Sequence, residues 1–181
     1  MPDIWFISDT HFGHTNILSF RSVTNGELIR PGFRDVKHMD EEMIERWNSV
    51  VKDNDKVYHL GDVAFGERVL DRVMPRLKGR KRLLLGNHDK LDVRAYRRYF
   101  QKIRSVQLFI GDKENLGFIC SHYPMHMDEL TFLGRTLLNV HGHIHERTLN
   151  DPFYFNISVE RINYTPIHYD ELMAMARRLR V

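Results

Sequence analysis

The stretch IWFISDTH, residues 4–11, is an apolar run that ends in two candidate metal ligands, Asp9 and His11. Four further apolar runs end in the same way: VYHLG before Asp62, RLLLG before Asn87 and His88, GFICS before His122, and LLNVHG before His143 and His145. Strands of an open α/β sheet carry their ligand-binding residues just past their C-terminal ends, where residues far apart in sequence converge. The sequence therefore predicts a metal site built at one edge of a sheet.

Length and composition limit the class of protein. A chain of 181 residues with 42% hydrophobic residues is long enough to bury a core, and we expect residues 1–181 to form one domain. No apolar run approaches the ~20 residues needed to span a bilayer. Asp3 stands where a signal peptide carries positive charge, so we expect a cytoplasmic protein with no membrane partner. The lone cysteine, Cys120, lies inside an apolar run and predicts a buried strand position.

The hydrophobic pattern alternates between strands and helices in the first half of the chain and then predicts consecutive strands. We expect helices over residues 39–51, 67–77 with a break near Pro75, 92–100 and 169–179. We expect strands over residues 3–8, 57–60, 82–85, 106–110, 117–120, 136–140 and 153–159. Asp40 is expected in the first turn of the helix that begins at Met39. The pattern predicts an α/β fold in which two sheets pack face to face with helices outside.

Each candidate site motif has a chemical and a plain structural interpretation. In Asp9-Thr10-His11 and in His143-Ile144-His145 the two ligand types are two residues apart, so on an extended chain both side chains point the same way. Gly61-Asp62 places a carboxylate at a strand end, but glycine–aspartate is also a common turn. Asn87 offers an amide oxygen to a metal, and His88 is free to act as an acid. A tight turn with an exposed histidine fits Asn87 and His88 equally well, and His122 is also compatible with a structural role.

Taken together, the five motifs DTH, GD, GNHD, SH and GHIH occur in the order found in the calcineurin-like metallophosphoesterase superfamily, which this chain resembles over residues 9–145. The resemblance implies a four-layer αββα sandwich, with two mixed β-sheets flanked by helices, and a binuclear metal centre. By the same resemblance, one ion is held by Asp9, His11, Asp62 and His145, and the second by Asp62, Asn87, His122 and His143. The mixed ligands suit two divalent transition-metal ions, with Mn²⁺ expected first and Fe, Zn²⁺, Ni²⁺ or Co²⁺ also compatible.

The resemblance also implies an activity. It predicts a metal-dependent phosphoesterase with a metal-bridging hydroxide as nucleophile and with His88 as the catalytic acid or phosphoryl-stabilising group. Phe65 stands where the protein-phosphatase branch has the Asp that orients this histidine, which argues against that branch and leaves His88 without an identified partner. We expect a phosphodiesterase acting on a small nucleotide-like phosphodiester. The alternatives are a phosphomonoesterase and a non-catalytic metal-binding scaffold, such as the retromer subunit of the same fold.

Three residues outside the five motifs are candidate substrate contacts. His14 follows His11 in a loop that must line the cleft, and Arg21 and Arg34 lie in the polar segment that comes next. An exposed flap with ordinary surface arginines fits that segment equally well. A net charge of +3 is compatible with an anionic substrate, and the sequence does not favour nucleic acid as a partner. A homodimer is compatible with the sequence.

Overall fold

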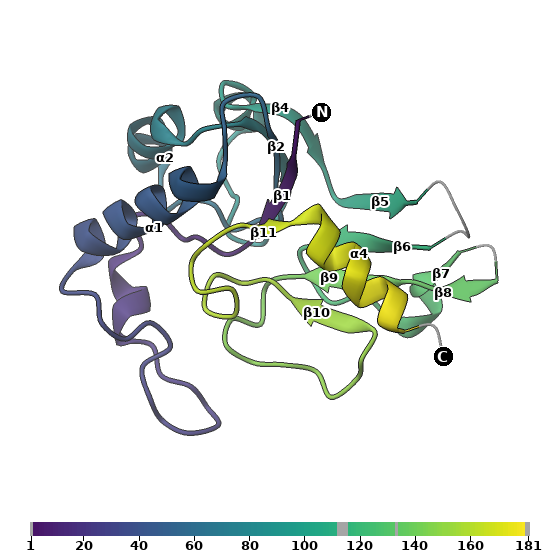
Figure 1. Cartoon of the computed structure of the whole chain (residues 1–181). Helices are drawn as coiled ribbons and strands as arrows, with labels where there is room; N and C mark the ends of the chain where they lie inside the picture. Colours follow the sequence, from purple (N-terminus) through teal and green to yellow (C-terminus); the bar gives the residue numbers. More distant parts are fainter. Residues whose placement is uncertain (1, 112–115, 133, 180–181) are drawn as a thin grey trace.

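Two mixed sheets packed face to face form the centre of the protein (Figure 1). The computed structural model describes residues 2–111, 116–132 and 134–179. The first sheet has the order β11-β1-β2-β3-β4, in which β1 to β4 are parallel and β11 is antiparallel to β1. Its strands are β1 (Ile4–Ile7), β2 (Lys56–His59), β3 (Arg80–Leu84), β4 (Phe100–Arg104) and β11 (Ile167–His168).

The second sheet has the order β10-β9-β6-β5, with β6, β9 and β10 parallel and β5 antiparallel to β6. Its strands are β5 (Val106–Ile110), β6 (Gly117–Ser121), β9 (Leu138–His141) and β10 (Tyr154–Asn156), and β7 (Thr131–Phe132) pairs separately with β8 (Arg135–Thr136). The two sheets meet through aromatic side chains. The ring of Phe6 lies 5.2 Å from that of Phe109 and 5.5 Å from that of Phe118, edge to face.

Helices flank this pair of sheets. On the outer face of the first sheet lie α1 (Val36–Val50), α2 (Glu67–Val73) with the 3-10 turn η2 (Met74–Arg76), and α3 (Val93–Arg97). The buried face of α1 presents Met43 and Trp47 to the sheet. The last helix, α4 (Tyr169–Arg178), buries Leu172 in the core between the sheets and contacts strands of both. Two more 3-10 turns are η1 (Thr15–Ser19) and η3 (Met127–Leu130). The α/β class with two mixed, helix-flanked sheets is thus confirmed.

The predicted boundaries of two helices were wrong, and the strands expected over residues 136–140 and 153–159 are shorter in the structure, at Leu138–His141 and Tyr154–Asn156. Helix α1 begins at Val36, because Asp35 caps it by accepting a hydrogen bond from the His38 amide at 2.8 Å. Asp40 therefore lies beyond the first turn, where it is buried and binds Arg72. The helix expected over residues 92–100 ends at Arg97, and β4 follows as an edge strand. Most residues of β4 are exposed, so it lacks the apolar run that identifies the inner strands.

Candidate metal centre

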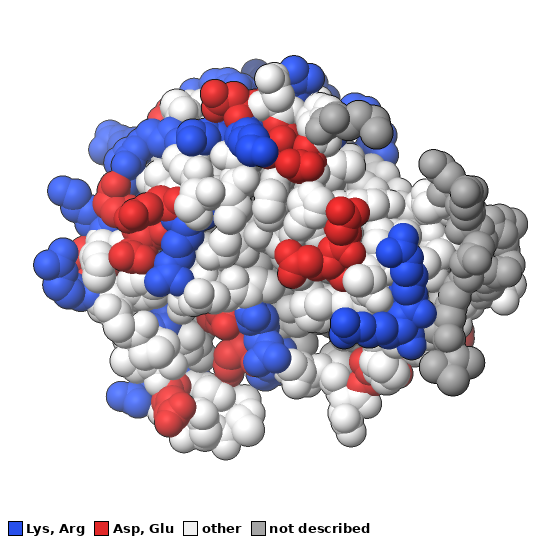
Figure 2. Space-filling view, viewed as in Figure 1, with Lys and Arg blue, Asp and Glu red and all other residues white. Residues whose placement is uncertain are grey.

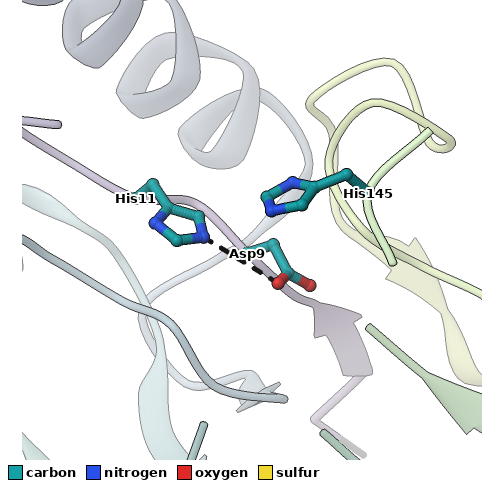
Figure 3. Close-up of side chains that lie close together, drawn as sticks. All are labelled: Asp9, His11 and His145. Carbon is teal, nitrogen blue, oxygen red and sulfur yellow. Dashed lines mark ion pairs between the residues drawn. The ribbon is translucent and has the colours of Figure 1, made fainter. Parts of the chain in front are cut away.

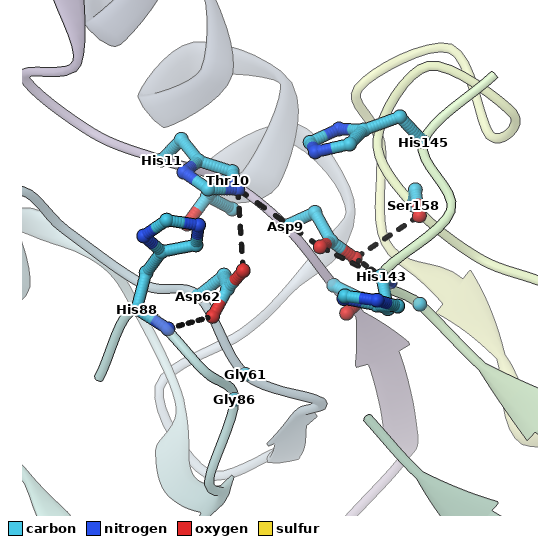
Figure 4. Close-up of polar contacts among 12 residues, drawn as sticks. Asp9, Thr10, His11, Gly61, Asp62, Gly86, His88, His143, His145 and Ser158 are labelled. Atoms are coloured by element: carbon cyan, nitrogen blue, oxygen red, sulfur yellow. Dashed lines mark hydrogen bonds and ion pairs between the residues drawn. The ribbon is translucent and has the colours of Figure 1, made fainter. Parts of the chain in front are cut away.

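The C-terminal ends of β1, β2, β3, β6 and β9 meet at one edge of the sandwich. A bridge between Ser8 and Ser158 joins the two sheets there. The candidate ligands follow these strand ends directly. Figure 4 shows the side chains of five of them converging from both sheets: Asp9, His11, Asp62, His143 and His145. Candidate ligands that lie as far apart in the sequence as Asp9 and His145 therefore come together at the sheet edge that the five motifs predicted.

Two groups of candidate ligands overlap at Asp9. One contains Asp9, His11 and His145 (Figure 3), and the other contains Asp9, Asp62 and His122; in each group the ligand atoms lie within 4.8 Å of one another. His11 is 2% exposed, yet neither of its ring nitrogens has a hydrogen-bond partner among the described residues. Burial, followed by the charge of Arg30, lowers the pKa of His11 far below its ordinary value. A buried neutral imidazole with bare nitrogens suits a metal ion.

A single oxygen of Asp62 lies near a histidine of each group. Asp62 Oδ2 is 3.5 Å from His11 Nε2 and also 3.5 Å from His122 Nε2. The other oxygen, Oδ1, accepts a hydrogen bond from the His88 amide at 2.8 Å. One carboxylate thus faces a histidine of each group, which is the arrangement that a carboxylate shared by two cations requires.

The hydrogen bonds around His122 provide a test of whether these residues fit a cation. His122 Nδ1 lies 2.8 Å from the carbonyl oxygen of Leu60, which only accepts, so Nδ1 carries the proton. In the neutral form of this ring, Nε2 has a bare lone pair that lies 2.9 Å from Asn87 Oδ1 and 3.5 Å from Asp62 Oδ2. His143 Nδ1 lies 3.0 Å from the same Asn87 oxygen. The acceptors His122 Nε2, Asn87 Oδ1 and Asp62 Oδ2 would repel one another without a cation among them, so the residues fit a metal ion.

A buried ion pair, which the sequence interpretation missed, supports His145. Glu160 Oε1 lies 3.0 Å from His145 Nδ1 and 2.7 Å from Arg30 Nε. Burial alone would raise the pKa of Glu160, but the charge of Arg30 and the contact with His145 outweigh it and lower the pKa to about 2. Burial alone would lower the pKa of His145, yet Glu160 outweighs that effect and raises it. The Glu160 carboxylate therefore fixes Nδ1 as the protonated nitrogen and leaves Nε2 for a ligand.

Arg30 was also missed, because it lies in the segment that the sequence suggested was a polar flap. It is 1% exposed and donates from its two terminal nitrogens to the carbonyl oxygens of Thr10 at 2.9 Å and Asp9 at 2.5 Å. The guanidinium therefore holds the backbone of the first ligand loop at the same time as it binds Glu160.

The ligand loops do not have the extended backbone on which the two-residue spacing argument relied. Asp9, His11, Asp62, His143 and His145 all have positive φ, between 48° and 70°, and they make up five of the seven non-glycine residues with this conformation in the described chain. The left-handed region is unfavourable for residues with a Cβ, and such strain concentrates at functional sites. The side chains converge because the loops turn sharply after each strand.

Two glycines leave space for the carboxylates. A Cβ on Gly142 would lie 2.1 Å from Asp9 Oδ2, and one on Gly86 would lie 2.2 Å from Asp62 Oδ1. Neither distance is compatible with a side chain, so the glycines in the GNHD and GHIH motifs are required by close approach. Beside them, the Asp89 carboxylate accepts hydrogen bonds from the amides of Asp62 and Gly86, both at 2.8 Å, and joins the loops after β2 and β3.

The ring of His88 lies beside the ligand cluster, 5.4 Å from the ring of His11. It makes no hydrogen bond within the described part of the chain, so no residue there orients it. Phe65 contacts it at 5.4 Å and stacks on His14 at 3.7 Å. Burial, with the charges of His88, Arg30 and His145, lowers the pKa of His14 to about 4.

The two proposed phosphate-binding arginines differ in position. Arg21 lines a pocket that His145 also lines. Arg34 is exposed near the start of α1. Its backbone amide donates a hydrogen bond to His38 Nδ1. On the face drawn in Figure 2, positive and negative side chains are interspersed. Across the described residues, no helix has the length and apolar character needed to cross a membrane.

Comparison with known proteins gives consistent results. The family profile described as calcineurin-like phosphoesterase matches residues 2–175. An uncharacterized protein of Methanocaldococcus jannaschii is 32% identical over 191 residues, covering 100% of this chain and 95% of the relative. The crystal structure of a protein of unknown function from Aquifex aeolicus has a TM-score of 0.74 at 28% identity, over 97% of this chain and 100% of that one. An archaeal phosphodiesterase has the same fold, with a TM-score of 0.50 at 21% identity over 86% of this chain and 83% of its own.

Proposed function

This chain belongs to the calcineurin-like phosphoesterase family, which supports a metal-dependent hydrolase, and we propose that it cleaves a small nucleotide-like phosphodiester. The observation that carries the proposal is the convergence of bare acceptor atoms around Asp62 Oδ2, which lies 3.5 Å from a histidine nitrogen of each ligand group. Two cations that share this carboxylate would relieve the repulsion among the acceptors.

The proposed centre holds two divalent ions. Asp9, His11, Asp62 and His145 would hold one, and Asp62, Asn87, His122 and His143 the other, with Mn²⁺ proposed before Fe, Zn²⁺, Ni²⁺ and Co²⁺ because carboxylate and amide oxygens share the site with imidazoles. Such ions supply charge that polarises a phosphoryl group and makes water acidic enough to act as the nucleophile at neutral pH.

His88 is the proposed catalytic residue. Its backbone is held by the hydrogen bond from its amide to Asp62, while its ring has no hydrogen-bond partner among the described residues. A protonated His88 ring would donate to the leaving-group oxygen, and a phosphodiester depends on such a donor because its alkoxide is a poor leaving group.

Charge around the site also favours a diester over a monoester. A phosphomonoester carries more negative charge than a diester and gains more from additional cationic side chains. Arg30 is the cation that contacts the first ligand loop, and it is already bound by Glu160 and by two backbone carbonyls. His14 and Arg21 are proposed substrate contacts because both lie next to candidate ligands, whereas the proposal for Arg34 rests on the sequence alone.

Hydrolysis of bis(4-nitrophenyl) phosphate and of 4-nitrophenyl phosphate would test the proposal, using the full chain stripped of metal and reloaded with Mn²⁺. We expect metal-dependent turnover that is greater with the diester. Asn87→Ala removes a proposed ligand and should abolish activity. His88→Ala, with two ions still bound, should lower kcat by roughly 10²-fold on a dinucleotide, whose alkoxide leaving group needs a proton, and much less on the nitrophenyl diester, whose leaving group does not.

Other outcomes would change the conclusion. Faster turnover of the monoester would show a phosphomonoesterase. Two bound ions without turnover of either ester, for every metal named above, would favour a scaffold. The proposal includes a cytoplasmic protein that forms one domain, takes a small phosphoester rather than a nucleic acid, and is compatible with a homodimer.

A further inference from the structure

A pocket of about 410 Å³ adjoins the ligand cluster at His145. One wall comes from residues 20–29, which project beside η1 in Figure 1, and the other from residues 144–147. We call it the flanking pocket. Its volume lies within the range of small-molecule sites, ~300 to 1,000 Å³.

Both walls are held in place. In the first wall, the Ile29 amide donates to the Phe20 carbonyl at 3.0 Å, and the next residue, Arg30, is anchored beneath the first ligand loop. In the second wall, the Asn156 side chain donates to the carbonyls of His145 at 2.6 Å and Arg147 at 2.8 Å. A pocket with both walls fixed needs little ordering when a ligand binds.

The inside of the flanking pocket is apolar and includes an aromatic ring. Phe20 is 44% exposed and Val23 is 86% exposed, and Ile29 and Ile144 are the other apolar residues of the lining. The ring of Phe20 lies 5.5 Å from that of His14, which lies 5.4 Å from that of His11. A planar group that stacks on Phe20 would therefore lie near the ligand cluster, and it could belong to the same substrate as a phosphate bound there.

The rim of the flanking pocket is polar. Arg21, Glu146 and Arg147 line it beside the apolar wall. Arginines donate in pairs to the carbonyl and ring-nitrogen edges of a base or to a phosphate, and a carboxylate accepts from an exocyclic amine. An apolar stacking face beside such groups matches a nucleobase, whose polar edge they can bind, better than an alkyl chain, which offers them nothing to bind.

We propose that the flanking pocket binds the nucleoside part of the phosphodiester substrate, with its base against Phe20 and its polar edge at Arg21, Glu146 and Arg147. This proposal rests on the proposed function. It specifies which group of the phosphodiester the protein recognises beside the metal centre. We assign the base to a small nucleotide ester. The end of a single strand has the same stacking chemistry, and the binding experiment below distinguishes the two.

Two diesters with the same leaving group test the assignment: the 4-nitrophenyl ester of thymidine 5′-phosphate and methyl 4-nitrophenyl phosphate. With Mn²⁺-reloaded full chain, the nucleoside ester should have a kcat/KM at least tenfold higher, mainly through KM. Phe20→Ala should reduce this ratio by roughly tenfold, and Phe20→Trp should restore it. Leu149→Ala is the matched control, because Leu149 is 41% exposed and lies outside the flanking pocket.

Equal kcat/KM for the two diesters, or a ratio unchanged by Phe20→Ala, would overturn the assignment and leave the phosphodiesterase intact. If neither diester is hydrolysed, the proposed function fails and the pocket is judged by binding, with saturation-transfer NMR of thymidine 5′-phosphate and of a short oligothymidylate. If Phe20→Ala weakens the binding of either probe, the pocket is supported as a base site. The probe that binds shows whether the base belongs to a mononucleotide or to a strand. Absence of binding would refute it.

Discussion

Replacement of Glu160 by glutamine tests whether the buried ion pair positions His145. The substitution keeps the shape of the side chain but removes the charge that binds Arg30 Nε at 2.7 Å and His145 Nδ1 at 3.0 Å. Both partners contact Oε1, and a glutamine oxygen in that position can accept from both, so the substitution removes the negative charge while an acceptor remains.

The expected effects follow from this geometry. Loss of one partner of a buried pair leaves Arg30 uncompensated, which costs about 3 kcal/mol of unfolding free energy. Without the negative charge, His145 is less basic and its Nδ1 proton is held less strongly, so metal affinity should fall by about 10- to 100-fold. The number of ions bound at saturation should stay the same, because Glu160 is not a ligand.

Competition with a fluorescent chelator gives the metal affinity, and urea unfolding of the metal-stripped protein gives the stability. The control is Glu42→Gln on α1, where the ion pair with Arg46 is about one-third exposed and contributes less than about 1 kcal/mol. A Glu160→Gln variant that loses stability but binds Mn²⁺ with unchanged affinity would refute the positioning role and leave a purely structural one.

The remaining predictions concern packing, pH and metal. Gly142→Ala should weaken metal binding by more than tenfold, because the new Cβ would displace Asp9. If chelator competition gives this variant the metal affinity of the wild type, the steric argument is wrong. His59 is fully buried, and burial lowers its pKa from 6.5 to about 3, so the unfolded chain takes up a proton between these values and the folded chain does not. Stability should therefore decrease as pH falls from 6.5 towards 3, by about 1.4 kcal/mol per pH unit from this group, and urea titrations of metal-stripped His59→Gln should show a shallower decrease. Removal of metal by chelation should lower Tm by roughly 5 to 10 °C relative to Mn²⁺ at 100 times its Kd, and an unchanged Tm in calorimetry would argue against ions bound at the folded site.

The sequence predicted the candidate ligands because their chemistry is local. Each follows an apolar run at a strand end, and this signal needs no knowledge of tertiary packing. The same signal was present at Glu160, which follows the expected strand over residues 153–159, but a single carboxylate after a strand is too common to single out. Only the contact with His145 distinguishes it.

Arg30 and β4 show the other limit of sequence reasoning. Arg30 lies in the stretch ELIRPGF, residues 27–33, which has no strand or helix pattern that would indicate that Arg30 is 1% exposed. Its burial depends on Glu160, 130 residues away in sequence. The strand β4 was not predicted, and the expected helix ran into its first residue, Phe100, because edge strands have few buried residues and no strong alternation. Both features arise from pairing between distant segments, which a local pattern does not encode.

The left-handed ligand loops explain why buried charge surrounds this site. Loops that are intrinsically strained at Asp9 and Asp62 need strong hydrogen bonds to their backbone groups. Arg30 supplies them by donating to the Asp9 carbonyl, and Asp89 by accepting from the Asp62 amide. Apolar residues of similar volume could pack as well in these positions, and such replacements are often neutral for stability, but they would release the loops. The buried charges are therefore best understood as the means by which the fold holds its ligands in place, with stability a secondary consequence.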